Sequence, residues 1–501
     1  MFKPAIGLEI HAELNTFSKM FCSCRNDSNP NLPPNTNICP VCLGHPGTLP
    51  VINKEAVKKV LKGGLALHCQ INRKSFFERK NYFYPDLPKG YQISQFSTPF
   101  CQNGFLSLGR KKIRIRRIHL EEDTGKLIHP AGADYSLIDF NRAGVPLLEL
   151  VTEPEITSSK EAALFSKELQ LILRYLHISG ADMEKGEMRV EVNISLAKSN
   201  KKLGTKVEIK NLNSIKAVEK SIEYEIKRQT EILKKGGTII QETRGWDDVK
   251  EITFPQREKE GSPDYRYFPE PDLPPFEIEE EFLEKIKAEL PELPSSRRER
   301  FRKEYGLIGK EQEIYVVQKE LGDYFEEIIS ELTNWVKEKE FKKRLTKEEF
   351  KKIVKIASNY LATDLQGLLS EKSLSVRDKK FLITAENFAE FVSMIYRKEI
   401  SSKIAKTLLK TMLETGKDPS QILEEEDLRP IVDKNELKAL VQEIIRNNPK
   451  AVKDYHQGKK NAFQFLIGEV MRKTKGTASP AELISVLKKE LDSFNKDSLA
   501  S

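Results

Sequence analysis

Residues 118–153 read IHLEEDTGKLIHPAGADYSLIDFNRAGVPLLELVTE, and the acidic residues of this segment organise the rest of the sequence. Two groups of these acids lie beside apolar runs: Glu121, Glu122 and Asp123, and further on Glu149. Valine, leucine and isoleucine flank both groups and predict two strands joined by a glycine-containing connection. A carboxylate in or beside an apolar core is costly unless it meets a cation, a hydrogen-bond donor or a metal. The segment therefore predicts two strands that share a cation.

The first strand of the chain predicts a similar polar face. In residues 5–13 the apolar side chains fall at positions 6, 8 and 10, so strand alternation places Glu9, His11 and Glu13 together on the opposite face. A histidine beside carboxylates from separate strands is a plausible ligand set for Mg²⁺ or Mn²⁺. The alternative is a group of acidic residues at a sheet edge with a hydrogen-bonded histidine.

Length and composition limit the class of protein. The usual size of a domain predicts about three domains for the 501 residues. The formal net charge of +8 allows a polyanionic partner without requiring one. There is no apolar run of membrane-spanning length and no signal peptide, which predicts a cytoplasmic protein with no membrane partner.

Four of the six cysteines crowd one loop. Cys22, Cys24, Cys39 and Cys42 form a C-x-C pair and a C-x-x-C pair around an Asn/Pro-rich segment that is too polar to build its own core. In a cytosolic chain this spacing indicates a metal loop and not disulfides. Four thiolates predict a closed, structural Zn²⁺ site. The alternative is four reduced thiols without a metal.

The pattern along the chain predicts an α+β fold that is followed by helices. Residues 1–294 mix strands, expected at 113–120, 189–196 and 205–210, with helices expected at 54–67, 158–176 and 214–235. Beyond the proline-containing break at 291–294, residues 295–410 are expected to form an all-helical domain. Residues 411–501 are expected to form a small helical tail domain. Capping boxes at Thr346/Glu349, Asp433/Glu436 and Ser479/Glu482 mark helix starts.

Several strand faces and loops carry polar groups that are suited to anions. On the strand at 188–196, Arg189, Glu191 and Asn193 share one face, and further on Lys206, Glu208 and Lys210 alternate in the same way. Two loops, residues 79–94 and 264–275, interleave tyrosines with basic residues, which can stack on a base and neutralise phosphate. The alternatives are a solvated sheet face and aromatic residues that pin a loop to the core.

The tail contains the strongest candidate in the sequence for a surface that binds a polyanion. Residues 448–476 contain Lys459, Lys460, Arg472, Lys473 and Lys475 and few acids. A solvated helical surface is the alternative. No Walker A motif, G-x-S-x-G elbow or H-E-x-x-H motif is present, so any use of ATP requires another kind of pocket.

The order of specific strings carries a family resemblance. They are IGLEIHAEL, RKNYFYPDLPKGYQISQ, IHLEEDTGK, DFNRAGVPLLELVTEP, GTKVEIKNLNS, DYRYFPEPDLPP and, in the tail, GEVMRKTKG. With these strings the chain closely resembles, over essentially its whole length, the B subunits of tRNA-dependent amidotransferases, the GatB family. Some members of that family have the four-cysteine loop and others lack it, in agreement with a structural role for zinc.

The resemblance implies a fold and an activity. The expected architecture is a mixed α/β cradle domain that binds ATP and Mg²⁺, a helical domain and a YqeY-like tail. The expected partners are an amidase A subunit, which releases ammonia from glutamine, and a small C subunit. The B subunit is expected to phosphorylate the side-chain carboxylate of Glu-tRNA(Gln) or Asp-tRNA(Asn), after which ammonia displaces the phosphate. Which of these tRNAs is served is left open.

The resemblance also implies site residues. The Mg²⁺ ligands are expected to be His11, Glu122 and Glu149, with Glu9 beside them as a fourth catalytic residue, while Glu121 and Asp123 are weaker candidates. The ATP and substrate pocket is expected to be lined by Lys80, Tyr82, Tyr84, Arg189, Glu191, Asn193, Lys206, Glu208 and Lys210. The basic residues of the tail are expected to contact the tRNA backbone. Two other hypotheses are a non-catalytic tRNA-binding scaffold for the amidase and a metal-dependent nuclease.

Overall fold

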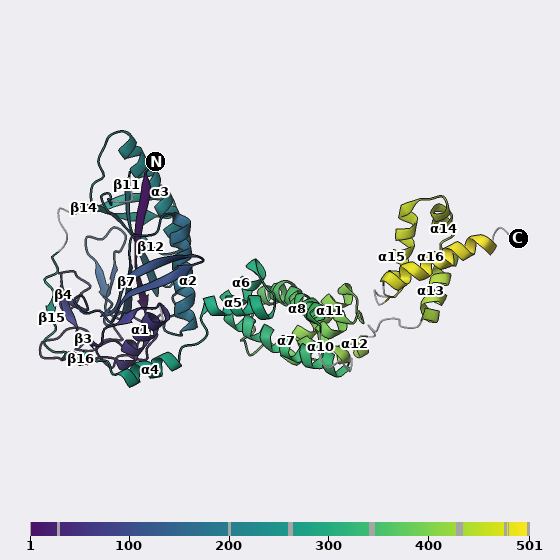
Figure 1. Ribbon diagram of the computed structural model, residues 1–501, viewed down its shortest axis with the longest axis horizontal. Coiled ribbons are helices and arrows are strands. Elements are labelled where there is room, and N and C mark those ends of the chain that lie inside the picture. The colour runs from purple at the N-terminus through teal and green to yellow at the C-terminus, as the bar shows by residue number, and fades with distance from the viewer. Residues whose placement is uncertain are drawn as a thin grey trace. The chain divides into compact units, whose positions relative to one another are not determined.

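The computed structural model describes residues 2–27, 31–198, 202–258, 264–339, 346–426, 434–474, 478 and 480–497. The chain forms two compact units, Met1–Pro294 and Ser295–Ser501 (Figure 1). The first unit mixes strands and helices and the second is helical, which confirms the predicted α+β class with a helical C-terminal region. Among the described residues, every helix is too short or too polar to cross a bilayer.

The first unit contains all the strands of the described chain. They are β1 Lys3–Glu13, β2 Gln70–Ile71, β3 Lys74–Ser75, β4 Glu78–Asn81, β5 Tyr91–Ser94, β6 Cys101–Leu108, β7 Lys111–Glu122, β8 Lys126–Ile128, β9 Leu137–Asp139, β10 Pro146–Thr152, β11 Met188–Ala197, β12 Val207–Leu212, β13 Glu242–Asp247, β14 Ile252–Glu258, β15 Phe268–Pro269 and β16 Phe276–Glu277. Its helices are α1 Lys54–Ala66, α2 Ser159–Tyr175, α3 Ile215–Lys234 and α4 Glu280–Ala288. The strands and helices predicted at the six ranges above are all present, to within a few residues at their ends.

A nine-stranded sheet forms the centre of this unit. Its strand order is β14-β13-β12-β11-β1-β10-β7-β6-β2, with antiparallel neighbours except for the parallel pair β12 and β13. The acidic segment thus supplies two adjacent strands, β7 and β10, and the first strand of the chain lies beside them. The polar residues of β1, β10 and β7 therefore lie on three neighbouring strands. The sequence predicted that β7 and β10 are neighbours.

One face of the sheet is apolar and covered by helices. Ile6, Leu8 and Ile10 of β1 are buried with Leu148 and Leu150 of β10 in a core that includes residues of α1, α2 and α3. In Figure 1, α2 and α3 run side by side along the sheet, and the two helices are in contact. Because side chains alternate along a strand, the odd-numbered residues of β1 face the other side of the sheet. That side carries the charged groups.

The second unit consists of helices around two separate cores. Its elements are α5 Pro294–Glu304, α6 Gly309–Val317, α7 Lys319–Lys339, α8 Lys347–Asn359, the π-helix η1 Tyr360–Leu365, α9 Gln366–Glu371, α10 Ala385–Tyr396, α11 Ser402–Thr415, α12 Pro419–Glu425, α13 Lys434–Asn447, α14 Pro449–His456, α15 Lys460–Lys473 and α16 Pro480–Asp497. One core contains buried residues between Phe301 and Leu423, and the other contains buried residues between Leu437 and Leu491. The expected domain boundary at 410/411 falls inside α11, whose Met412 and Leu413 are buried in the first of these cores.

The capping boxes have different outcomes. The box formed by Thr346 and Glu349 is present at the start of α8, with both reciprocal hydrogen bonds. The N-cap residues of the other two predicted boxes, Asp433 and Ser479, lie outside the described residues. Pro480 is the first residue of α16, as the preference of proline for the first helical turn predicts.

Candidate active site and metal-binding clusters

Three neighbouring strands carry a row of histidine, glutamate and histidine. In the antiparallel pairing of β1 with β10, His11 lies opposite Glu149. In the pairing of β10 with β7, Glu149 lies opposite His119. Side chains directly opposite each other share a face of the sheet, so both imidazoles flank one carboxylate. Glu9 and Glu121 lie two residues along the outer strands on the same face.

These five side chains, Glu9, His11, His119, Glu121 and Glu149, form one cluster that we call the His–Glu cluster. His11 Nε2 lies 3.4 Å from Glu149 Oε2, 3.6 Å from Glu121 Oε1 and 4.0 Å from Glu9 Oε1. His119 Nε2 lies 3.3 Å from Glu149 Oε2 and 3.7 Å from Glu121 Oε2. The ligand atoms form two groups, Glu9–His11–Glu149 and His119–Glu121–Glu149, each compact enough to hold one metal ion.

Burial and charge shift the protonation of this cluster strongly. Burial alone raises the pKa of Glu149, but the adjacent His119 and His11 hold it well below its ordinary value. Burial lowers the pKa of His11, yet the hydrogen bond and the charge of Glu149 outweigh burial and raise the pKa to about 9. Burial, followed by repulsion from Glu149, raises the pKa of Glu9 to about 7. Without a metal, the imidazoles are therefore protonated and hold the carboxylates together.

Glu122 does not belong to the cluster, which corrects the predicted ligand set His11, Glu122 and Glu149. Adjacent residues of a strand point to opposite faces, so Glu121 faces His11 while Glu122 points away from it. Glu122 instead accepts hydrogen bonds from Lys89 Nζ at 2.7 Å and from the backbone N–H of Ile93 at 3.0 Å. Glu121 therefore occupies the place that the sequence assigned to Glu122.

Several of the predicted pocket residues surround the cluster. Lys210 Nζ lies 2.6 Å from Glu191 and 3.1 Å from Glu208, across β11 and β12. Arg189 lies 2.8 Å from Asp123, which is therefore an ion-pair partner beside the cluster and not a ligand within it. Asn193 Oδ1 is buried and has no hydrogen-bond partner among the described residues. The structure thus brings these residues onto the charged face of the sheet.

The two predicted aromatic loops meet at the edge of this face. Strand β15 pairs with β4, which places the Tyr265 ring 5.9 Å from the rings of both Tyr82 and Tyr267. Lys80 Nζ lies 5.3 Å from the Tyr265 ring centre. Burial lowers the pKa of Lys80, but attraction to Glu121 and Glu149 outweighs burial and raises it well above its usual value. Lys80 is therefore a fixed positive charge beside the cluster.

Two predicted pocket residues are not brought to the site. The Tyr84 side chain is 59% exposed, in the turn after β4. Lys206 is exposed just before β12 begins. Sequence reasoning also missed His119 and Arg117, whose guanidinium lies 3.4 Å from Glu149. Strand parity was the signal that could have identified both, because they alternate with the buried Ile118.

The four loop cysteines come together as the sequence predicted. Their Sγ atoms all lie within 4.8 Å of one another, and all four thiols are free. The hydrogen bond from Cys22 lowers the pKa of Cys42 to about 5, and the backbone N–H of Cys39 donates to Cys42 Sγ at 3.1 Å. The fully buried Lys19 places its ammonium 3.9 Å from the same sulfur. This donor set is compatible with a tetrahedral zinc ion.

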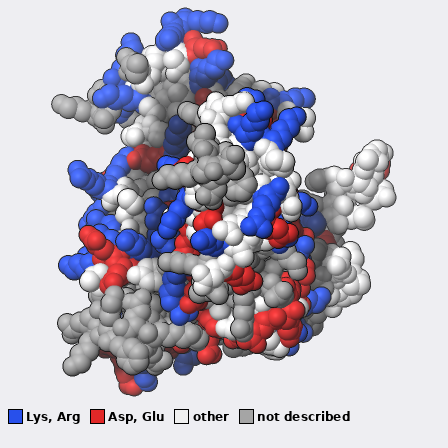
Figure 2. Space-filling view, turned by 90° about the vertical axis from the view of Figure 1, so that its right-hand side faces the viewer, with Lys and Arg blue, Asp and Glu red and all other residues white. Residues whose placement is uncertain are grey.

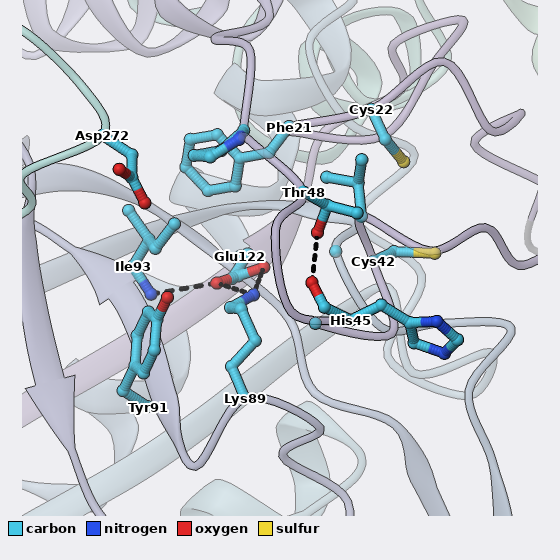
Figure 3. Close-up of a pocket in the computed structure, with 14 residues that line it drawn as sticks. Phe21, Cys22, Cys42, His45, Thr48, Lys89, Tyr91, Ile93, Glu122 and Asp272 are labelled. Atoms are coloured by element: carbon cyan, nitrogen blue, oxygen red, sulfur yellow. Dashed lines mark hydrogen bonds and ion pairs between the residues drawn. The ribbon is translucent and has the colours of Figure 1, made fainter.

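A cavity of about 110 Å³ lies between this loop and Glu122. Figure 3 shows Glu122 pointing toward Lys89, with Cys22 and Cys42 on another wall of the cavity. Gly44 has a φ of +66°, and a Cβ atom there would lie 2.4 Å from Lys89 Cγ, so glycine gives Lys89 room to reach Glu122. The cavity therefore lies on the opposite side of β7 from the His–Glu cluster.

The predicted basic residues of the tail that the structure describes lie on α15 or at its start. Lys459, Arg472 and Lys473, which we call the tail cations, form ion pairs with Asp454, Glu469 and Glu443, respectively. Lys475 and the side chain of Lys460 lie outside the described structure. Figure 2 shows basic and acidic side chains interspersed on the face drawn. Each of the tail cations thus already has an acidic partner within the chain.

Comparison with known proteins covers nearly the whole chain. Residues 4–284 match the family model described as "GatB/GatE catalytic domain", and residues 341–491 match the one described as "GatB domain". The chain is 45% identical over 497 residues to the B subunit of aspartyl/glutamyl-tRNA(Asn/Gln) amidotransferase from Caldicellulosiruptor bescii. It is 46% identical over 500 residues to the protein of that name from Thermotoga maritima. Each alignment covers 98% of this chain and 99% of the relative.

Proposed function

The chain belongs to the GatB family of amidotransferase subunits, and we propose that the first unit activates the amino acid on a misacylated tRNA. The relatives are named as B subunits of aspartyl/glutamyl-tRNA(Asn/Gln) amidotransferases, which are carbon–nitrogen ligases. The substrate is then Glu-tRNA(Gln), Asp-tRNA(Asn) or both. The observation that carries the proposal is the His–Glu cluster, with His119, Glu121 and Glu149 buried and Glu9 and His11 partly buried, beside Lys80 and the two tyrosine-bearing loops.

The proposed reaction has two steps that conserve atoms and charge. A side-chain carboxylate oxygen of the aminoacyl group attacks the γ-phosphorus of ATP, the bond to the bridging oxygen breaks, and ADP leaves. Ammonia then attacks the acyl carbon of this acyl phosphate, inorganic phosphate leaves with the bonding electrons, and the nitrogen loses a proton to form the amide. The first step is needed because a carboxylate is a poor acyl donor.

The residues of the cluster fit a divalent cation. Carboxylate oxygens and imidazole nitrogens suit Mg²⁺ and Mn²⁺, and the N···O separations of 3.3–4.0 Å leave room for an ion between them. A bound cation neutralises charge on the phosphates and on the transferred phosphoryl group. Glu149, Glu121, Glu9, His11 and His119 hold it in a preformed site, because their backbones are fixed by the sheet.

The surrounding cations and polar groups bind the remaining phosphate and substrate oxygens. Lys80, whose pKa is raised, and the guanidinium of Arg117 both lie beside Glu149, where they stabilise negative charge that develops on phosphoryl transfer. Arg189, Glu191, Asn193, Glu208 and Lys210 extend the polar floor across β11 and β12. Tyr82, Tyr265 and Tyr267 offer aromatic faces for a base.

We also assign a structural Zn²⁺ ion to Cys22, Cys24, Cys39 and Cys42. Four protein thiolates leave no open position for catalysis, and the metal orders a loop that has too few apolar residues to order itself. The ammonium of Lys19 offsets part of the negative charge of four thiolates.

The remaining parts of the proposal concern the partners. An amidase A subunit supplies ammonia, a small C subunit completes the heterotrimer, and the tail cations bind the tRNA backbone. Contacts with phosphate are electrostatic and do not read sequence. A scaffold without catalysis has no use for a buried cluster of three carboxylates and two histidines, which favours the catalytic function.

A label-transfer assay tests the proposal. The chain, assembled with its A and C partners, receives γ-labelled ATP, Mg²⁺ and Glu-tRNA(Gln) without an ammonia source. We expect tRNA-dependent ATP turnover with an acyl phosphate on the aminoacyl group, and its loss in Glu149→Gln. Glu153→Gln is the matched control, because this acid follows β10 and forms an exposed pair with Arg116 at 2.9 Å. Background turnover in the unmodified complex, with tRNA still bound, refutes catalysis by this chain.

A further inference from the structure

Glu13 is a carboxylate on the charged face of the sheet to which the proposed phosphoryl transfer gives no role. Alternation along β1 places its side chain on the same face as that of His11, two residues before it. In the pairing of β1 with β10, Glu13 lies opposite Leu147, while His11 lies opposite Glu149. Glu13 therefore occupies the row of side chains next to the one that contains the centre of the His–Glu cluster.

The carboxylate of Glu13 has no hydrogen-bond or ion-pair partner within the described part of the chain, although the side chain is partly buried. Its neighbour across the strand pair, Leu147, is apolar and offers no donor. Two arginines act on Glu13 through their charge, but Arg189 lies 2.8 Å and Arg142 3.4 Å from Asp123. Both guanidinium groups are thus held by another carboxylate.

The other acids of this face that the structure describes each have a cationic partner. Examples are Glu149 with His11 at 3.4 Å, Glu191 with Lys210 at 2.6 Å and Asp123 with Arg189 at 2.8 Å. A partly buried carboxylate without a cation or a donor is costly. The unpaired oxygens of Glu13 therefore point to a cation that arrives with a ligand.

We propose that Glu13 binds the α-ammonium group of the aminoacyl-tRNA whose side-chain carboxylate is phosphorylated at the His–Glu cluster. This assignment rests on the proposed function for the identity of its ligand. The amino acid is joined to the tRNA through its α-carboxyl group, so its amino group is free to carry a positive charge. A hydrogen bond between an ammonium and a carboxylate is charge-assisted and among the stronger ones in proteins.

The spacing along β1 suits a single aminoacyl group. Positions two residues apart in a strand lie about 6.8 Å apart, which is the separation between His11 and Glu13 along β1. An extended glutamyl group spans about 5 Å from its side-chain carboxyl carbon to its α-nitrogen. The side-chain carboxylate therefore reaches the cluster while the α-nitrogen lies within hydrogen-bonding reach of Glu13.

Binding at this end positions the substrate for the reaction. An aminoacyl group that is held at its α-nitrogen presents its side-chain carboxylate to the phosphoryl group in a restricted set of orientations, which raises the rate of attack. The α-ammonium is common to the glutamyl and the aspartyl substrates. Glu13 therefore recognises an aminoacyl ester and does not choose between the two amino acids.

The experiment compares Glu-tRNA(Gln) with glutaryl-tRNA(Gln), whose acyl group lacks the α-ammonium and keeps the side-chain carboxylate. The assembled heterotrimer receives γ-labelled ATP and Mg²⁺ without an ammonia source, and the formation of acyl phosphate gives kcat/KM for each tRNA. We expect the unmodified complex to use the glutaryl substrate about tenfold less efficiently or worse. Glu13→Leu should lower kcat/KM for Glu-tRNA(Gln) by about the same factor and should not lower the value for glutaryl-tRNA(Gln).

Two further variants complete the comparison. Glu13→Gln keeps an oxygen that accepts a hydrogen bond from the ammonium but removes the charge, so its loss on Glu-tRNA(Gln) should be intermediate. Glu184→Leu is the matched control, because it makes the same change at an exposed acid in the segment before β11. This control should leave both values of kcat/KM unchanged.

Two results overturn the assignment: equal use of the two substrates by the unmodified complex, or a ratio between the substrates that Glu13→Leu leaves unchanged. The second result marks a structural or metal-binding role for Glu13. Where Glu13→Leu fails to fold, the ratio in the isosteric Glu13→Gln is read in the same way. Acyl phosphate formation with equal use of both tRNAs refutes this assignment alone. Absence of ATP turnover with Glu-tRNA(Gln) in the unmodified complex refutes the proposed function and the assignment together.

Discussion

The protonation of His11 makes the stability of the metal-free first unit depend on pH. The ordinary pKa of histidine is 6.5, and the folded chain raises the pKa of His11 to about 9. A raised pKa means that the folded state binds the proton more tightly than the unfolded state. The stabilisation is therefore complete below pH 6.5 and is lost as pH rises through 9. The difference of about 2.5 between the two pKa values corresponds to about 3 kcal/mol.

We expect His11→Gln to remove this pH dependence. Glutamine keeps a polar side chain beside Glu149 but cannot carry the proton, so the variant should be less stable than the unmodified chain at pH 6.5. The difference between the unfolding free energies of the variant and the unmodified chain should shrink by about 3 kcal/mol between pH 6.5 and 9. Glu9 also titrates, with a pKa near 7. Much of the contribution of Glu9 to the pH dependence of stability cancels when the two chains are compared, because both chains keep Glu9.

Urea unfolding followed by tryptophan fluorescence measures this difference. The chain has two tryptophans, and Trp246 lies buried in β13 of the first unit. Both proteins therefore carry Trp335→Phe, which leaves Trp246 as the reporter of the first unit. The buffers contain no divalent cation. A difference in unfolding free energy between the two proteins that is the same at pH 6.5 and at pH 9 refutes the reasoning.

Two further predictions concern the cysteine loop and the tail. Lys19→Met removes the buried ammonium 3.9 Å from Cys42 Sγ and should accelerate loss of zinc to a chelator about tenfold or more. Lys58→Met, a change at an exposed pair with Glu289, is the control and should leave the rate of zinc loss unchanged. Equal rates of zinc loss in both variants contradict the role assigned to Lys19. Replacing the three tail cations by glutamate should weaken tRNA binding and make its salt dependence shallower, by up to about 0.9 in the log–log slope for each lost phosphate contact. Filter binding across a salt series measures this change, and an unaltered slope refutes the contact.

The sequence predicted the strands of this site better than their pairing. Alternation along residues 5–13 placed Glu9 and His11 on one polar face, and the structure has them there because Ile6, Leu8 and Ile10 face the helices. The register that sets His11 opposite Glu149 comes from contacts between strands more than a hundred residues apart. Periodicity within one strand carries no information on that register.

The choice between Glu121 and Glu122 shows a different limit. Ile118 and Leu120 are buried in the core beneath the helices, so strand parity alone assigns Glu122 to their face and Glu121 to the opposite one. The signal was present, but two adjacent acids match the family motif equally well. His119 shares the parity of Glu121 and was missed because the alternation along this strand was not applied to it. Tyr84 and Lys206 failed differently. Tyr84 lies in the segment after β4, and Lys206, which the alternation over 205–210 included, precedes β12, which begins only at Val207.

Adjacent residues of β7 connect the two candidate metal sites. Glu121 faces the His–Glu cluster, while Glu122 accepts hydrogen bonds from Lys89 beside the cysteine loop. Lys89 passes Gly44 only because that position has no side chain, and Gly44 lies two residues after Cys42. Order in the loop therefore fixes Lys89, Lys89 fixes Glu122, and Glu122 helps to hold the end of the strand that presents Glu121. The proposed zinc ion, which has no catalytic position of its own, would thus influence the proposed reaction by keeping one carboxylate of the cluster in place.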